Sequence, residues 1–162
     1  MTAKFRISEQ DYLNAQKLHR KLTPKKLWFI SLLGSTLTLM ALLGPNAMQA
    51  MAIGGLIGGI AVLLLIPTLI APYVGKRHYR KYKAIQEELS MSVTDEGIRI
   101  TTPNGDSIVL WDKVLKWRQS EQYVLVYIMP MLYYIVPTHL TNQGFDLAKL
   151  KHFLIQHVGD EC

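Results

Sequence analysis

The feature that most constrains this chain is an uncharged stretch over residues 27–75. These 49 consecutive residues contain no Asp, Glu, Lys, Arg or His. A short turn, Gly44-Pro45-Asn46, divides the stretch into two apolar runs. At 1.5 Å per residue, runs 27–43 and 47–74 form helices of about 25 and 42 Å, against a bilayer hydrocarbon core of about 30 Å. The sequence therefore predicts a transmembrane hairpin over residues 27–75.

Two other interpretations of the apolar runs fit less well. A helical hairpin inside a soluble domain would carry a polar face, and neither run has one. A secretory signal peptide would have a shorter apolar region, whereas 26 mostly polar residues precede the first run. Pro67 lies inside the second run, where it removes a backbone donor, so we expect a kink between Leu63 and Pro67.

Basic residues on both sides of the hairpin predict its orientation. The turn between the runs has no charge, so the positive-inside rule predicts that both termini lie in the cytoplasm. Anionic lipid, rather than nucleic acid, explains most of the net charge of +6. The candidate lipid contacts are Lys21, Lys25, Lys26, Lys76, Arg77, Arg80, Lys81 and Lys83.

The segments outside the hairpin divide into an N-terminal arm (1–26), a basic juxtamembrane helix (76–88) and a sheet domain (89–162). In the arm, Ser8 and Asp11 form a capping pattern before an amphipathic helix whose apolar residues recur every three or four positions: Tyr12, Ala15, Leu18 and Leu22. We interpret this helix as lying on lipid headgroups, with a specific binding role as the alternative. Residues 5–7 are expected to pair with an edge of the sheet and so cover it.

Alternating apolar and polar residues predict about five antiparallel strands, at residues 89–93, 98–101, 106–111, 123–128 and 132–136. Gly97 is expected to supply a positive φ in a turn, and Asn104-Gly105 is typical of a hairpin. Residues 111–117 are read as a bend that turns Trp111, Val114 and Leu115 inward. An apolar stripe over residues 144–158 predicts a C-terminal helix across the sheet, which gives an α+β fold.

Four glycines in the second apolar run form two small-xxx-small pairs that allow close helix packing: Gly54 with Gly58, and Gly55 with Gly59. We favour packing against the first helix of the same hairpin over dimerisation. Neither helix has an ionisable side chain, which argues against a pump or a coupled transporter.

Motifs of catalytic chemistry are missing from the sequence. His139, His152 and His157, with the single Cys162, do not form a zinc ligand set, and there is no Gly-x-Ser-x-Gly elbow or phosphate-binding loop. We therefore predict no enzymatic activity, metal or cofactor. The aromatic group of Tyr123, Tyr127, Tyr133 and Tyr134 is interpreted as cross-strand packing, with a peptide or lipid groove as the alternative.

Three motifs stand out in these parts: Phe5 followed by Asp11-Tyr12, the bend Trp111-Asp112-Lys113-Val114, and the strand Tyr134-Ile135-Val136-Pro137. Together with the order of the parts, these motifs resemble the YcxB-like family of bacterial membrane proteins. The family often has a basic residue after this proline, whereas Thr138-His139 stands here, which argues against a lipid-phosphate role at this position. The resemblance implies a pleckstrin-homology-like domain at the bacterial inner membrane, with no established activity.

Three classes of function are considered. The favoured hypothesis is a binding or scaffolding module tethered to the cytoplasmic leaflet, where it engages lipid headgroups or an unknown protein partner. The alternative is a structural membrane oligomer that self-associates through the glycine-rich second helix. An enzyme is the third and least favoured class.

Overall fold

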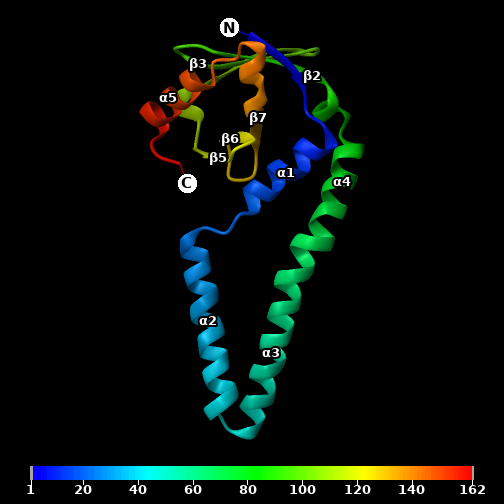
Figure 1. The fold of residues 1–162 in the computed structure, drawn as a ribbon, viewed down its shortest axis with the longest axis vertical. Helices are drawn as coiled ribbons and strands as arrows, with labels where there is room; N and C mark the ends of the chain where they lie inside the picture. The colour runs from blue at the N-terminus through cyan, green and yellow to red at the C-terminus, as the bar shows by residue number, and fades with distance from the viewer. Residues whose placement is uncertain (1, 162) are drawn as a thin grey trace. The chain divides into compact units, whose positions relative to one another are not determined.

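The computed structural model describes residues 2–161, and the chain divides into two units (Figure 1). Unit 2, Lys21–Val74, is a helical hairpin. Unit 1 is built from the segments before and after the hairpin, residues 2–20 and 75–161. The elements follow in the order β1 (Thr2–Arg6), α1 (Glu9–Arg20), α2 (Pro24–Leu43), α3 (Asn46–Leu65), a π-helical stretch (Ile66–Ile70), α4 (Ala71–Lys81), β2 (Glu88–Val93), β3 (Gly97–Thr102), β4 (Gly105–Leu110), β5 (Lys116–Gln119), β6 (Tyr123–Tyr127), β7 (Tyr133–Pro137) and α5 (Leu147–Val158).

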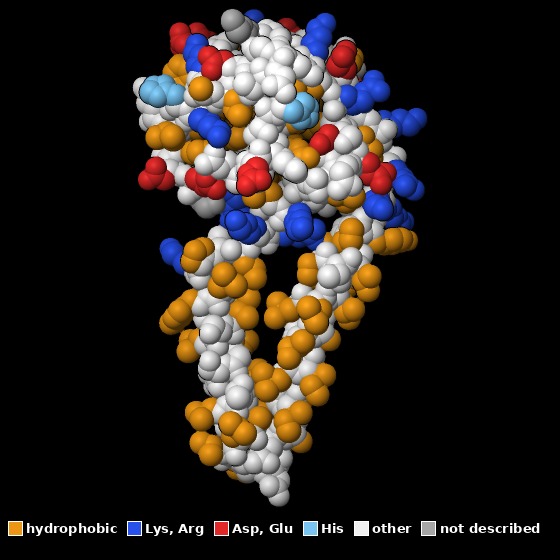
Figure 2. Space-filling model, in the orientation of Figure 1, with side chains coloured by type: hydrophobic (Ala, Val, Ile, Leu, Met, Phe, Trp, Pro, Cys, Tyr) orange, Lys and Arg blue, Asp and Glu red, His pale blue; other side chains and the backbone are white. Residues whose placement is uncertain are grey.

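The helices of unit 2 expose their apolar side chains. Pro24–Leu43 and the continuous helix Asn46–Lys81 are long and apolar enough to cross a membrane. Figure 2 shows hydrophobic side chains along both helices of the hairpin, and Ala52 is the buried residue that the structure records on α3. A kink was expected between Leu63 and Pro67. At Pro67 the structure shows a change to π-helical hydrogen bonding over Ile66–Ile70.

Unit 1 contains two antiparallel sheets. The first has the strand order β1-β2-β3-β4, and the second has the order β5-β6-β7. In the first sheet β1 pairs with β2, with Thr2 opposite Ser92 and Arg6 opposite Glu88, which confirms that the N-terminal arm joins the sheet. The core lies between the sheets and α5, whose Leu150 and Leu154 are fully buried. The fold is therefore α+β, with seven strands in two sheets where about five in one sheet were predicted.

The interpretation of α1 as a helix on lipid headgroups was wrong. Ala15 is fully buried in the core of unit 1, and Tyr12 and Leu18 pack against that core. Leu22 lies beyond the end of the helix and is exposed. One face of α1 is thus committed to the protein interior.

Other local predictions need correction. The basic helix was expected to run to residue 88, but α4 ends at Lys81, where Tyr82 takes an extended conformation before a short 3₁₀ turn, Lys83–Gln86. Within the bend at Trp111–Lys113, Trp111 and Val114 are buried as expected, but Leu115 is exposed. The extra strand β5 begins at Lys116, inside the segment 111–117 that was read as the bend, and ends at Gln119.

Gly97 is required for a different reason from the one predicted. Its φ is not positive; instead, a Cβ at this position would overlap the carbonyl of Val109 on the neighbouring strand. A positive φ, of 149°, occurs at Gly105, which follows the two-residue connection between β3 and β4. The hairpin expected at Asn104-Gly105 is therefore present, with Thr102 paired to Gly105.

Candidate functional site

The start of α1 is fixed by reciprocal hydrogen bonds between Ser8 and Asp11. The amide of Asp11 donates to Ser8 Oγ at 3.1 Å, and the amide of Ser8 donates to Asp11 Oδ2 at 3.0 Å. This is the capping arrangement that the sequence predicted, and it satisfies donors that the helix cannot satisfy itself. It also aims the other carboxylate oxygen of Asp11 towards the second sheet.

A cluster of tyrosines lies where α1 covers the second sheet. We define this tyrosine cluster as Tyr123 and Tyr127 of β6, Tyr133 of β7, and the α1 residues that contact them, Asp11, Asn14 and His19. The Tyr123 hydroxyl donates to Asp11 Oδ1 at 2.7 Å. Burial raises the pKa of the Asp11 carboxyl, but the hydrogen bonds from Ser8 and Tyr123 outweigh it and lower that pKa overall. Burial, with the nearby Asp11 carboxylate, raises the pKa of Tyr123. At neutral pH this pair therefore holds a carboxylate and a neutral phenol.

The C-terminal end of α1 contacts the same sheet. His19 Nδ1 lies 3.0 Å from the Tyr127 hydroxyl, and the His19 ring stacks on Tyr133 with centroids 5.1 Å apart. The Arg118 guanidinium on β5 donates to the carbonyls of Leu18 and His19 at 3.4 and 3.2 Å. A guanidinium suits this position because the last carbonyls of a helix lack partners within the helix.

Sequence reasoning did not identify His19 or Arg118. About one hundred residues separate Arg118 from the carbonyls it binds, so no local pattern links them. The expected cross-strand packing of tyrosines is confirmed for one pair, because Tyr127 lies opposite Tyr133 in the sheet with ring centroids 5.1 Å apart, whereas Tyr123 lies opposite Pro137 and Tyr134 opposite Val126.

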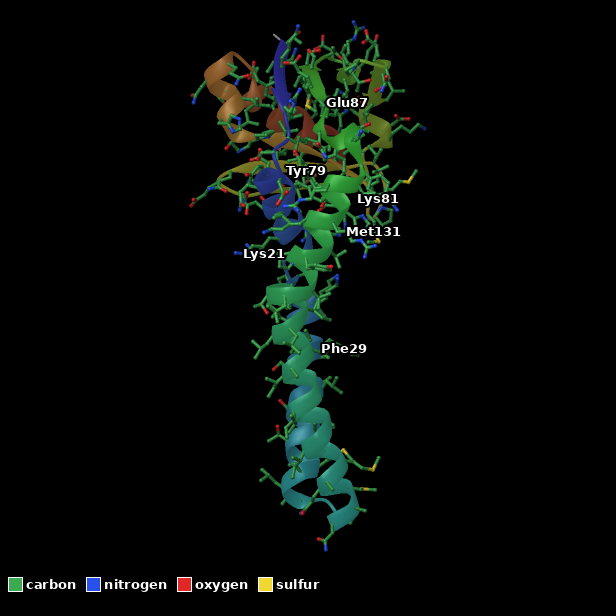
Figure 3. The ribbon with its side chains drawn as sticks, turned by 90° about the vertical axis from the view of Figure 1, so that its right-hand side faces the viewer. Lys21, Phe29, Tyr79, Lys81, Glu87 and Met131 are labelled. Atoms are coloured by element: carbon green, nitrogen blue, oxygen red, sulfur yellow. The ribbon has the colours of Figure 1, made fainter. Side chains whose placement is uncertain are left out.

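A second set of contacts, the α1–α4 clamp, joins α4 to the N-terminal segment of unit 1. The Tyr79 hydroxyl donates to the carbonyl of Ile7 at 2.8 Å, and Tyr79, labelled in Figure 3, lies on α4. Gly75 is buried, and a Cβ there would lie 2.6 Å from Gln16 Oε1. Arg80 forms an ion pair with Glu9 at 3.2 Å, although its exposure limits the contribution to about 0–1 kcal/mol.

The residues predicted to contact lipid are all exposed, and they lie on both units. Lys21, Lys25 and Lys26 belong to unit 2, and the other five belong to unit 1. Arg80 is engaged by Glu9, and Lys81 Nζ lies 5.9 Å from the centroid of the Tyr82 ring. The structure therefore leaves these cations on the surface.

The four glycines of α3 contact little within a single chain. A Cβ at Gly55 would lie 3.8 Å from Leu37 of α2, whereas a Cβ at Gly54, Gly58 or Gly59 would meet nothing within 4 Å. The preferred interpretation was that all four glycines pack against α2, but only Gly55 lies close to that helix.

Two histidines of α5, His152 and His157, are involved in ring packing. His157 stacks on Trp111 with centroids 5.8 Å apart, and His152 packs edge-on against Phe153. His139 is exposed. Within residues 2–161, no three or more His, Cys, Asp or Glu side chains are grouped closely enough to hold a metal ion. Cys162 lies outside the described residues.

Comparison with known proteins gives one match. Residues 93–154, which run from the end of β2 into α5, match the family described as YcxB-like protein. No curated protein and no solved structure matches the chain.

Proposed function

Because residues 93–154 form a YcxB-like domain, we propose that this protein is a membrane-tethered binding or scaffolding module. In this proposal the hairpin crosses the membrane twice, and unit 1, of pleckstrin-homology-like character, presents its surface to a ligand on one side. The proposed location is the bacterial inner membrane, with both termini in the cytoplasm. The proposed activity is binding rather than catalysis.

One observation carries the topology of this proposal. Unit 1 combines segments from before and after the hairpin, and β1 pairs with β2 along five residues. Both segments must be in the same compartment to form that sheet. A hairpin with two membrane crossings meets this requirement, whereas a single crossing would separate β1 from β2.

The charges favour the cytoplasmic side. Basic residues flank the hairpin at both ends, and its turn, Gly44-Pro45-Asn46, carries no charge. Each exposed Lys or Arg near an anionic leaflet contributes on the order of 1 kcal/mol. The same residues thus support an anionic lipid partner, and the basic character needs no nucleic acid.

Accessibility of introduced cysteines tests this topology. Cys162 is first replaced by serine, and single cysteines are then introduced at Asn46 in the turn, at Thr2 and at Glu161. We expect a membrane-impermeant maleimide to label only Asn46→Cys in spheroplasts, and all three variants after lysis. Labelling at Thr2 or Glu161 before lysis would place unit 1 outside the cytoplasm and overturn the proposed orientation.

The ligand of unit 1 is tested by crosslinking in native membranes. If the protein is a scaffold, crosslinked material will contain a second protein or lipid in reproducible proportion to this chain. Recovery of this chain crosslinked only to itself would instead favour the structural oligomer.

The structural oligomer is the second candidate, and the glycines of α3 favour it. Gly54, Gly58 and Gly59 leave open space that another helix can approach closely. If this is the function, Gly58→Leu will remove crosslinked dimers from membranes. Gly34→Leu, on α2, is the matched control because its Cβ also meets nothing within 4 Å. Dimers that persist in Gly58→Leu would exclude this helix face as the interface.

A further inference from the structure

Four exposed apolar side chains gather at one end of the second sheet; we call this group, Leu115, Met129, Met131 and Leu132, the loop tip. Residues 128–132 connect β6 to β7, and backbone hydrogen bonds between Met129 and Leu132 close this turn in both directions, at 3.2 and 3.3 Å. The amide of Leu115 donates to the carbonyl of Tyr127 at 2.8 Å, which places it beside the start of the turn. The apolar side chains thus come from two segments that the sheet holds together.

The loop tip is unusual in its exposure. Met131 is 82% exposed and Met129 is 58% exposed, although the adjoining strand β6 is buried along its whole length. Exposed apolar groups of this kind mark surfaces that bind a protein or a membrane. Methionine is flexible and polarizable, so it adapts to an irregular apolar environment such as the acyl-chain boundary.

The surroundings of the loop tip are basic. Lys116 follows Leu115 in the sequence, with its ammonium 5.0 Å from the centroid of the Tyr127 ring. Burial raises the pKa of Tyr133, and the positive charge of Arg20 partly opposes this, so Arg20 is also near. The sequence contains no Asp or Glu between Gln122 and Phe145. An apolar tip with cations beside it suits an anionic membrane surface.

A short covalent connection joins the part of unit 1 beside the loop tip to the first helix of the hairpin. His19 stacks on Tyr133, the residue after the loop tip, and Pro24 begins α2 only five residues later. Five extended residues span at most about 17 Å. In Figure 3, Met131 is labelled below Lys81, one of the cations at the end of α4.

From these observations we infer that the loop tip is a second membrane anchor, which inserts its apolar side chains into the interfacial region of an anionic bilayer. This inference rests on the proposed function, because it takes the hairpin to be in the membrane. It assigns the bilayer as the partner of this face of unit 1. In a domain anchored this way, the opposite end of unit 1 stays available for another ligand.

Site-specific fluorescence on the full chain tests the inference. With Cys162 replaced by serine, an environment-sensitive fluorophore is attached to Met131→Cys, Ile155→Cys or Phe29→Cys, and each protein is reconstituted into phosphatidylcholine–phosphatidylglycerol vesicles. Ile155 is the matched control, since it is an exposed apolar residue of α5 on unit 1. Phe29, on α2, reports whether the hairpin is in lipid. Lipids with a shallow doxyl quencher are then added to the bilayer.

We expect the quencher to reduce emission at Met131→Cys at least about twofold more than at Ile155→Cys, because interfacial insertion brings the probe to the quencher. If the probe at Phe29→Cys is quenched but the probe at Met131→Cys stays as bright as that at Ile155→Cys, the inference is overturned and the tethering proposal stands. No quenching at Phe29→Cys would overturn both. A loop tip that is shielded from the quencher by a second copy or by another protein gives the first of these negative results.

Discussion

The two units use similar apolar side chains in opposite ways. In unit 1, Leu, Ile and Val residues are buried between two sheets and α5, and the Tyr123 hydroxyl donates a hydrogen bond to Asp11. In unit 2 the same residue types point outward, and the helices satisfy their own backbone. The difference teaches that unit 1 carries its own apolar core, whereas the hairpin leaves its apolar side chains exposed, as the proposed location in a bilayer would require.

Truncating a core leucine should give the largest effect. Leu154 is fully buried, so Leu154→Ala is expected to lower the free energy of unfolding of unit 1 by roughly 2–5 kcal/mol, through lost burial and a residual cavity. Hydrogen exchange of the β6 amides in the reconstituted protein measures this. Leu64→Ala is the matched control, because Leu64 is 60% exposed on α3, and it should leave β6 exchange unchanged. Equal effects of the two variants on β6 exchange would contradict the contrast between a buried core in unit 1 and exposed apolar side chains in unit 2.

A charge in the hairpin should have the next largest effect. Ile57→Lys near the middle of the uncharged stretch is expected to raise the free energy of membrane insertion by about 3 kcal/mol. The measurement is the fraction of protein that resists alkaline extraction from membranes. Ile108→Lys places the same charge on an exposed strand position of unit 1, and its membrane fraction should equal that of the wild type. Full retention of Ile57→Lys would contradict a bilayer location for α3.

Glycine substitutions sharpen the comparison at a smaller scale. Gly97→Ala brings a Cβ into the backbone of Val109, which is not free to move aside within the sheet. We therefore expect the free energy of unfolding of unit 1 to fall by about 1–3 kcal/mol. Gly54→Ala adds a methyl group to open space on α3 and should be neutral. Chemical unfolding followed by tryptophan fluorescence distinguishes them, since Trp111 and Trp117 are buried in unit 1. A neutral Gly97→Ala would show that the strands separate there.

The smallest expected effect concerns pH. The folded state lowers the pKa of Asp11, so its contribution to stability is present above the unfolded pKa of about 4 and is lost as the pH falls through the folded value. We expect Asp11→Asn to lower the free energy of unfolding at pH 7 by on the order of 1 kcal/mol. The stability of this variant should also fall less on acidification than that of the wild type. Unfolding midpoints between pH 7 and pH 3 measure this. If the unfolding midpoints of both proteins fall equally with decreasing pH, Asp11 is not the group whose titration destabilises the fold.

The sequence predicted most accurately where one local rule dominates. The uncharged stretch defined both helices of unit 2, and alternation located β2, β3, β6 and β7 because each has at least one strongly apolar face. It failed for β5, where Trp117 and Arg118 are adjacent and both buried, so no alternation is visible. Trp117 donates to the carbonyl of Gly159 while Arg118 reaches α1, and these distant partners decide their burial.

The candidate site was harder to predict than the fold. Ser8 and Asp11 could be recognised as a helix cap because their interaction is local. That Asp11 also accepts from Tyr123 depends on a contact across 112 residues, and the same holds for His19 and Tyr127 across 108. The amphipathic pattern of α1 indicated an apolar face, but it did not indicate whether a bilayer or a sheet would cover that face.

The pairing of β1 with β2 also sets an order of events during synthesis. Thr2 and Ser92 are partners in the sheet, yet the ribosome makes the whole hairpin between them. At about 5–20 residues per second, the first strand waits several seconds for its partner, longer than the closure of local turns takes. In the proposed membrane topology, the whole hairpin is therefore available for insertion before the first sheet can be completed, and the finished sheet closes the chain into a loop that contains the hairpin.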